Sequence, residues 1–148
     1  MRGQCLCGEV AFEIDENTTT TTNIYQCHCS LCRKVTGSAC NSGVLVTTGG
    51  FQWLSGQGAV SSYIKDSGYR SDFCKYCGSP TPNEMRDGSG YWIPAGALED
   101  TTTLKVTAHL CTQSKAGWDH FTSSNENYDS MPSLQQLKDA IARPNKIK

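Results

Sequence analysis

Apolar residues along the chain alternate with polar residues over short stretches, which is the spacing of β-strands. Val10, Phe12 and Ile14 occupy every second position, so their side chains share one face of an extended segment. Further short apolar runs are separated by clusters of Gly, Ser, Asp and Thr, as strands separated by turns would be. These runs are 44–46, 60–64, 91–93 and 104–110. The pattern predicts a small, turn-rich protein built mainly from β-strands.

Helical spacing occurs in one stretch near the C-terminus. Its apolar residues share one helix face, and they are Leu134, Leu137 and Ile141. Ser133 and Gln136 have the three-residue spacing of a capping box at the helix start. A shorter helix is predicted over 31–35, ending before Gly37. The threonine-rich segment 18–22 follows neither pattern and is predicted to be a surface loop.

Charge and length narrow the function classes. The 148 residues include 13 Lys and Arg against 14 Asp and Glu, and the basic residues are scattered rather than gathered in a block. This distribution argues against a nucleic-acid-binding surface. No apolar run approaches the roughly 20 residues needed to span a bilayer, and no signal-peptide pattern opens the sequence. We therefore expect one domain over residues 1–148, no membrane contact and a cytoplasmic location.

Cysteine content is the unusual feature of the composition. The chain has nine cysteines, an odd number, and most of them occur in tight clusters. Disulfides are rare in a reducing cytoplasm, where clustered cysteines are more often metal ligands. The sequence therefore favours metal binding over a disulfide framework.

Two cysteine pairs have the spacing of zinc ligands. Residues two apart on a strand point the same way, so the sulfurs of Cys5 and Cys7 converge. Cys74 and Cys77 have the spacing of a tight turn, and a glycine follows each pair. Four thiolates give the tetrahedral shell that zinc prefers. Spacing alone leaves open whether Cys74 and Cys77 join the first pair or the cysteines of segment 27–32.

Segment 27–32 offers three further thiols within six residues: Cys27, Cys29 and Cys32. Three protein ligands with one exchangeable position are typical of catalytic zinc. His28 as a fourth ligand would close the site, but strand alternation directs it to the opposite face. Cys40 and Cys111 would also close the site, although isolated cysteines are more often buried apolar residues.

Several blocks in this order resemble the glutathione-dependent formaldehyde-activating enzyme family, which includes centromere protein V-like proteins. The resemblance runs from Gly3 to about Met131. The matching blocks are 3–8, 27–34 followed by Gly37 and Ser38, 73–80, 95–100, His109, and 114–116 before Trp118. Thr81 and Gly117 differ from the usual family residues. The resemblance implies a mainly β fold called the β-tent or Mss-four-like fold, with small coiled antiparallel sheets, here followed by the short C-terminal helix.

The resemblance also implies how the cysteines divide between two zinc ions. Cys5, Cys7, Cys74 and Cys77 match the ligands of a structural zinc. Cys27, Cys29 and Cys32 match the ligands of a catalytic zinc.

The implied activity is that of S-(hydroxymethyl)glutathione synthase, a carbon–sulfur lyase that joins glutathione to formaldehyde or runs in reverse. Arg33 and Lys34, next to the last ligand, are predicted to contact the carboxylates of glutathione. His28 and His109 are candidates for a general base. The alternative is a non-enzymatic zinc-binding or partner-binding module of the same fold.

Overall fold

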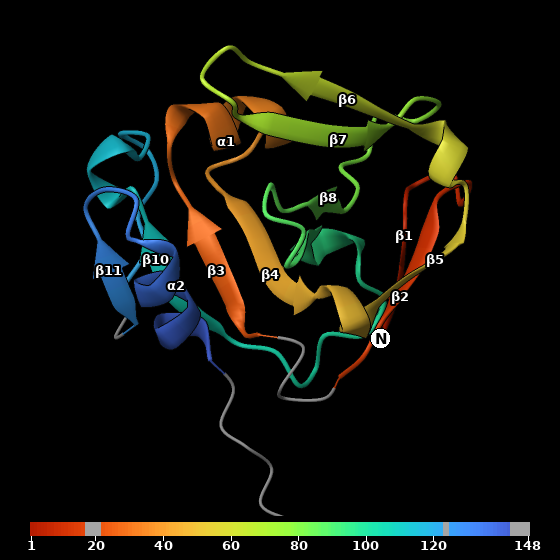
Figure 1. Ribbon diagram of the computed structural model, residues 1–148. Coiled ribbons are helices and arrows are strands. Elements are labelled where there is room, and N and C mark those ends of the chain that lie inside the picture. Colours follow the sequence, from red (N-terminus) through yellow and green to blue (C-terminus); the bar gives the residue numbers. More distant parts are fainter. Residues whose placement is uncertain (17–21, 123–124, 143–148) are drawn as a thin grey trace, which may run out of the picture.

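The computed structural model describes residues 1–16, 22–122 and 125–142, so most of the threonine-rich segment lies outside the described residues. The described chain forms eleven strands and two α-helices (Figure 1). The helices are α1 Ser30–Thr36 and α2 Leu134–Ile141. The strands are β1 Arg2–Gln4, β2 Ala11–Ile14, β3 Ile24–Cys27, β4 Asn41–Thr47, β5 Phe51–Ser55, β6 Val60–Ile64, β7 Arg70–Cys74, β8 Asn83–Glu84, β9 Gly90–Pro94, β10 Val106–Leu110 and β11 Glu126–Tyr128. Short 3-10 turns connect some of them: η1 Thr48–Gly50, η2 Gln57–Ala59, η3 Ala95–Ala97 and η4 Thr112–Ser114.

The strands are arranged in three small sheets. One has the order β1-β2-β5, and the β6–β7 hairpin forms a two-stranded sheet of its own. The largest has the order β11-β10-β3-β4-β9-β8. This mainly β architecture with a short C-terminal helix confirms the predicted fold class. Helix α2 begins with the predicted capping box between Ser133 and Gln136.

Strand β10 corrects one detail of the expected architecture. The sheets were expected to be antiparallel, but β10 runs parallel to both of its neighbours, β3 and β11. Leu110 pairs with Cys27, and its carbonyl accepts a hydrogen bond of 2.9 Å from the His28 amide. An alternating pattern reports which strand face is buried and says nothing about strand direction. The parallel pairing places the end of β10 beside the first cysteine of segment 27–32.

Each predicted apolar run overlaps a strand, whereas six further strands were not predicted. The run 104–110 forms a strand only from Val106 onward. The strands missed are β1, β3, β5, β7, β8 and β11, each of two to five residues. Such short segments show too few alternations for the strand period to stand out from a loop.

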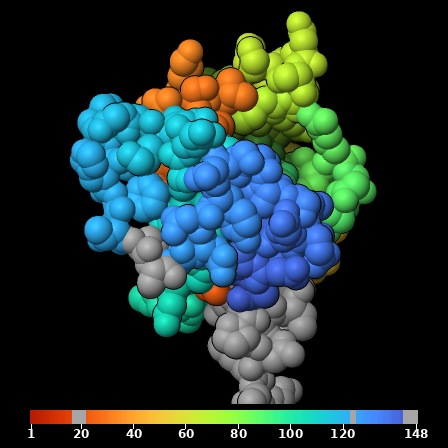
Figure 2. All heavy atoms as spheres, turned by 90° about the vertical axis from the view of Figure 1, so that its left-hand side faces the viewer, coloured from red at the N-terminus to blue at the C-terminus, as the bar shows by residue number. Residues whose placement is uncertain are grey.

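Strand β4 lies at the centre of the core. Val44 and Val46 pack on one side with Phe12 of β2. Leu45 belongs to the cluster on the other side, together with Leu137 of α2. A strand covered on both faces carries a continuous apolar run, as 44–46 does. Figure 2 shows the blue segment that contains α2 on the outer surface of the molecule, and Leu137 and Ile141 of α2 belong to this second cluster.

The β6–β7 hairpin lies beside α1 at one end of the largest sheet (Figure 1). Both elements contribute to the wall of one cavity, which confirms that they are neighbours. Within the part of the chain that the structure describes, no helix is long and apolar enough to cross a lipid bilayer.

Candidate functional site

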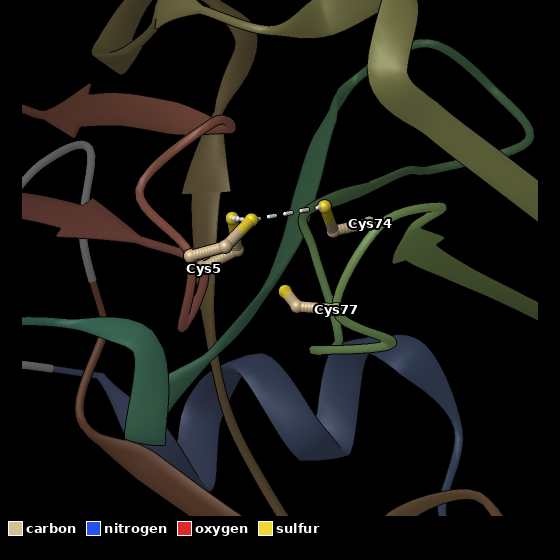
Figure 3. Close-up of side chains that lie close together, drawn as sticks. Cys5, Cys74 and Cys77 are labelled. Atoms are coloured by element: carbon tan, nitrogen blue, oxygen red, sulfur yellow. Dashed lines mark hydrogen bonds between the residues drawn. The ribbon is translucent and has the colours of Figure 1, made fainter.

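Two turns that are far apart in sequence meet at the first cysteine cluster (Figure 3). Cys5 and Cys7 lie just after β1, Cys74 ends β7, and Cys77 lies in the turn that follows. The four sulfur atoms all lie within 4.8 Å of one another. The Cys7 sulfur is 3.5 Å from that of Cys5 and 3.8 Å from that of Cys74. We call these four residues the quartet.

Local backbone structure explains why each turn presents its sulfurs together. Gly8 and Gly78 follow the pairs with φ of +78° and +76°, a left-handed conformation that glycine adopts without strain. The Gly8 amide donates to the Cys5 carbonyl at 2.9 Å, and the Gly78 amide donates to the Cys74 carbonyl at 2.8 Å. A third amide, that of Val10, lies 3.3 Å from the Cys5 sulfur and donates to it. The backbone thus curls around the cluster and supplies donors to sulfur.

Ser79 links the two turns of the quartet. Its hydroxyl oxygen accepts a hydrogen bond of 3.0 Å from the Leu6 amide and lies 3.3 Å from the Cys77 sulfur. Hydrogen bonds from the Ser79 side chain and backbone lower the pKa of Cys77 to about 5. A cysteine with this pKa is a thiolate at neutral pH, which is the form that binds metal.

The geometry of the quartet fits a zinc ion. Four thiolates at the usual Zn–S distance of about 2.3 Å, arranged as a tetrahedron, have their sulfurs about 3.8 Å apart. The sulfur separations of 3.5 and 3.8 Å are close to that value. They are far longer than the roughly 2.05 Å of a disulfide bond. The nine cysteines are all free.

The second cluster is built at the junction between β3 and α1. Cys27 is the last residue of β3, Cys29 is the N-cap of α1, and Cys32 lies in its first turn. The Cys29 sulfur accepts a hydrogen bond of 3.4 Å from the Cys32 amide. The three sulfurs lie within 4.8 Å of one another. We call these residues the trio. Among residues 1–16, 22–122 and 125–142, groups of metal-type ligands occur only at the quartet and the trio.

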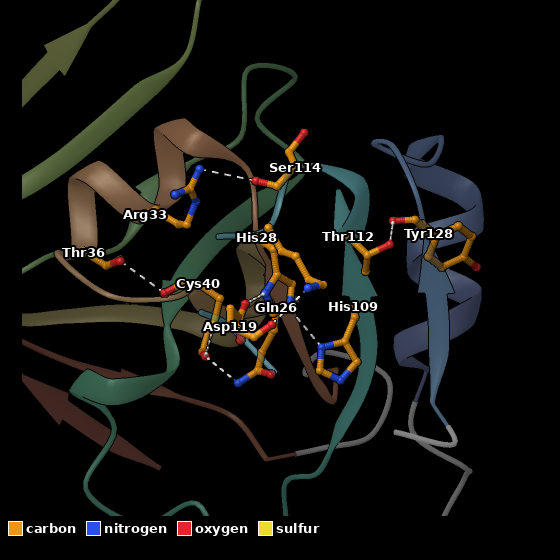
Figure 4. A network of polar contacts seen from close by, with 12 residues as sticks. Gln26, His28, Arg33, Thr36, Cys40, His109, Thr112, Ser114, Asp119 and Tyr128 are labelled. Atoms are coloured by element: carbon orange, nitrogen blue, oxygen red, sulfur yellow. Dashed lines mark hydrogen bonds and ion pairs between the residues drawn. The ribbon is translucent and has the colours of Figure 1, made fainter. Parts of the chain in front are cut away.

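His28 follows the last residue of β3 and is not a member of the trio; its two ring nitrogens face Asp119 and His109 (Figure 4). Its Nδ1 lies 2.7 Å from Oδ2 of Asp119, and its Nε2 lies 3.0 Å from Nδ1 of His109. The Phe121 ring stacks on both imidazoles, with centroid distances of 4.7 and 4.2 Å. Burial, followed by the charge of His28, lowers the pKa of His109. His28, His109 and Asp119 form a buried network, in which His28 stands between two residues of the trio in the sequence.

No sequence pattern pointed to Asp119 or Phe121 as members of this network. Both follow the last family block, in a segment without strand or helix periodicity. An aspartate acquires a structural role here only because the fold brings it to a histidine 91 residues away.

Cys40 and Cys111 do not join the trio. Cys111 is buried in the cluster that also contains Cys27 and Cys32, as expected for an apolar cysteine. Burial, and then the nearby Cys27 thiol, raise the pKa of Cys111 to about 12. Cys40 is only half-buried, and its sulfur lies 3.9 Å from the Ser42 hydroxyl.

A cavity of about 640 Å³ opens beside the trio, and Cys27 and Cys32 form part of its wall. Much of the lining is apolar or aromatic, including Trp92 and Tyr69. The Tyr69 hydroxyl donates to the Cys32 sulfur at 3.9 Å. Burial, and then the neighbouring Cys32 thiol, raise the pKa of Tyr69, so the phenol is neutral near pH 7. The size and composition are those of a small-molecule site.

The predicted carboxylate-binding residues do not line this cavity. Arg33 instead donates through Nη2 to the Ser114 carbonyl at 3.3 Å, as Figure 4 shows, and Lys34 is exposed. The basic residues in the cavity wall are Arg70 and Arg86, which the sequence reasoning missed. Arg70 precedes Cys74 and Arg86 follows Cys77, but neither spacing is typical of a ligand-binding motif. Only the folded chain therefore identifies these arginines as part of the cavity wall.

Comparison with known proteins agrees with this geometry. The sequence profile described as glutathione-dependent formaldehyde-activating enzyme matches residues 1–114, which include the quartet and the trio. The chain is also similar in fold to a Rhodobacter sphaeroides protein of known crystal structure, with 23% sequence identity and a TM-score of 0.54. That alignment covers 69% of this chain and 91% of the other. Curated protein sequences gave no match.

The matched segment is well over half of the 148 residues and contains every predicted zinc ligand. The chain therefore belongs to the glutathione-dependent formaldehyde-activating enzyme family.

Proposed function

We propose that this protein is a zinc-dependent carbon–sulfur lyase that joins the thiol of glutathione to formaldehyde, or catalyses the reverse cleavage. The observation that carries the proposal is the trio, a cluster of three thiols whose members Cys27 and Cys32 open onto a cavity. Three thiolates leave a tetrahedral ion one exchangeable position. A small molecule in the cavity would lie next to two of the three ligands of such an ion.

The trio would hold the catalytic zinc, and the quartet would hold a structural zinc. Zinc with an exchangeable position lowers the pKa of a bound thiol and so supplies a thiolate near neutral pH. The addition forms one carbon–sulfur bond, since the sulfur lone pair attacks the carbonyl carbon and the C=O π pair moves to oxygen. The thiol gives up one proton and the new hydroxyl gains one, so the reaction is balanced without a redox partner.

The cavity accommodates more than formaldehyde. Its volume of about 640 Å³ is within the range of about 300 to 1,000 Å³ that holds drug-sized ligands, whereas formaldehyde has only two heavy atoms. The charged side chains in the wall suit a zwitterionic peptide, and they are Arg70, Asp72, Glu84 and Arg86. Arg70 is ion-paired with Asp72 at 2.7 Å. We therefore propose Arg86 as a carboxylate contact, whereas Arg33 and Lys34 remain the sequence-based candidates.

The quartet would stabilise one domain over residues 1–148. Its ligands come from the turn after β1 and from the end of the β6–β7 hairpin, so an ion there joins two separate sheets. Thiolate ligands persist in a reducing environment, which is consistent with a cytoplasmic protein.

The proposed activity is tested by exchange NMR on an equilibrated mixture of formaldehyde and glutathione. The spontaneous addition is already fast, so the exchange rate must be compared with and without protein. We expect the exchange rate to rise in proportion to the concentration of zinc-loaded protein. Absence of any rise, with glutathione or another small thiol and with formaldehyde or a larger aldehyde, would reject the proposal.

Ser79→Ala should weaken zinc binding at the quartet by about 10- to 100-fold, the usual effect of losing a hydrogen bond to a metal ligand. The substitution removes the hydroxyl that lies 3.3 Å from the Cys77 sulfur, so the pKa of Cys77 should rise toward its ordinary value. The measurement is competition with a chromophoric chelator in a Cys29→Ala background, which leaves only the quartet to bind zinc. Ser130→Ala, at an exposed position outside both clusters, is the control. Equal zinc affinity in the two variants would show that Ser79 does not support the ligands.

A further inference from the structure

Tyr69 is held next to the trio by the β6–β7 hairpin. It lies immediately before β7, where its carbonyl accepts a hydrogen bond of 2.9 Å from the Lys65 amide. Gly68 allows the turn with φ of +83°, and Arg86 donates a hydrogen bond to the Gly68 carbonyl. The Tyr69 ring packs against the core cluster that contains Cys32. The hydrogen bonds of the turn and the packing against the core therefore hold the Tyr69 phenol in place, although Tyr69 lies in the turn between β6 and β7.

The Tyr69 hydroxyl lies next to one sulfur of the trio, and Tyr69 lines the cavity. Its oxygen is 3.9 Å from the Cys32 sulfur, and both residues line the same cavity. This hydrogen bond to sulfur is long and therefore weak, and a phenol keeps its proton at neutral pH, so the O–H group can turn to a better acceptor. When a thiol adds to an aldehyde, the oxygen stays on the carbon that becomes bonded to sulfur. This oxygen is such an acceptor.

Addition of a thiolate to an aldehyde places negative charge on the carbonyl oxygen. A donor aimed at the position where this charge develops stabilises the transition state more than the ground state. We propose that the Tyr69 hydroxyl donates a hydrogen bond to the aldehyde oxygen as the carbon–sulfur bond forms, an inference that rests on the proposed lyase function. Tyr69 keeps its own proton. The proton that completes the product hydroxyl comes from solvent and replaces the one released by the thiol.

Other candidate donors near the trio are less well placed. His28 binds both Asp119 and His109 in the buried network, and neither histidine lines the cavity. The Arg70 guanidinium is ion-paired with Asp72. Tyr25 lines the cavity too, but its ring is buried edge-on against Trp92 and packs closely over Gly43.

The test is Tyr69→Phe, which removes the hydroxyl and keeps the ring. We expect kcat of the zinc-loaded protein to fall about 100-fold, the lower end of the effect of losing one donor to a developing oxyanion. Zinc content and the KM for glutathione should stay at wild-type values. Tyr63→Phe is the matched control, because Tyr63 lies on the neighbouring strand β6, is exposed and does not line the cavity.

A binding measurement tests the same contact without turnover. S-acetylglutathione carries a carbonyl oxygen on the carbon bonded to sulfur, whereas S-isopropylglutathione has a methyl group in that place. Titration calorimetry should show that Tyr69→Phe weakens binding of the acetyl compound about fivefold, typical of one lost hydrogen bond, and leaves the isopropyl compound unchanged.

The outcomes separate this inference from the function on which it rests. A fall in kcat together with selective loss of S-acetylglutathione affinity would support the Tyr69 role. Wild-type kcat in Tyr69→Phe would overturn that role and leave the lyase function standing. A wild-type protein that does not accelerate the exchange would overturn both.

Discussion

Cys74→Ala is expected to unfold the protein or to lower its melting temperature sharply, because it opens the quartet. A structural zinc contributes roughly 10 kcal/mol of folding free energy in small metal-binding domains. Domains of this size are stable by only about 5 to 15 kcal/mol in total, so the loss is comparable with the whole stability. Cys74 is fully buried, and its removal also leaves a cavity where β7 meets the turn after β1. Circular dichroism melts of zinc-loaded protein measure the effect.

Cys40→Ala is the matched control for Cys74→Ala. Cys40 is half-buried and belongs to neither cluster, so its loss should change the melting temperature by a few degrees at most. A Cys74→Ala variant that melts like Cys40→Ala and still binds two zinc ions would disprove the structural role of the quartet.

Cys29→Ala is expected to lower the zinc content from about two ions per chain to about one and to abolish catalysis, with the fold retained. Cys29 supplies one of the three thiols of the trio, and the remaining two are too few to hold zinc tightly. The trio connects residues close in sequence, so the fold depends on it less than on the quartet. Metal analysis, circular dichroism and exchange NMR on one preparation measure the three effects.

Cys29→Ser separates the metal effect from a local effect on α1. The Cys29 sulfur caps the helix by accepting from the Cys32 amide, and loss of an N-cap costs about 1 kcal/mol. Serine is a good N-cap but a poor zinc ligand, so Cys29→Ser should keep the stability of the wild type and still lose one zinc. If Cys29→Ala unfolds the chain while Cys74→Ala does not, the roles of the two clusters are the reverse of those proposed.

The longer apolar strands could be read from the sequence, because burial imposes a period on side chains, whereas the six shortest or least regular strands could not. The alternation of Val10, Phe12 and Ile14 predicted β2, and the continuous run 44–46 fell in a strand covered on both faces. The capping box at Ser133 predicted the start of α2. Strand direction could not be predicted in this way, because a strand buries the same alternate residues whether its neighbour runs parallel or antiparallel.

The candidate ligands could also be read from the sequence, since thiols at short spacing converge through local backbone geometry alone. This explains the trio, in which Cys27, Cys29 and Cys32 meet across one strand–helix junction. It also explains each half of the quartet. Spacing could not show that the two pairs join, because they are 67 or more positions apart in the sequence; the structure brings all four sulfurs within 4.8 Å of one another.

The sequence by itself determined the mainly β class, both helices and the seven cysteines suited to metal. Tertiary structure decided what surrounds them: a cavity at the trio, Tyr69 beside Cys32, and Asp119 turned toward His28. The physical reason is the distance along the chain over which each kind of sequence pattern acts. Local periods and ligand spacings act within one or two turns of backbone, whereas a cavity wall is assembled from strands and loops that only the packing of separate sheets makes neighbours.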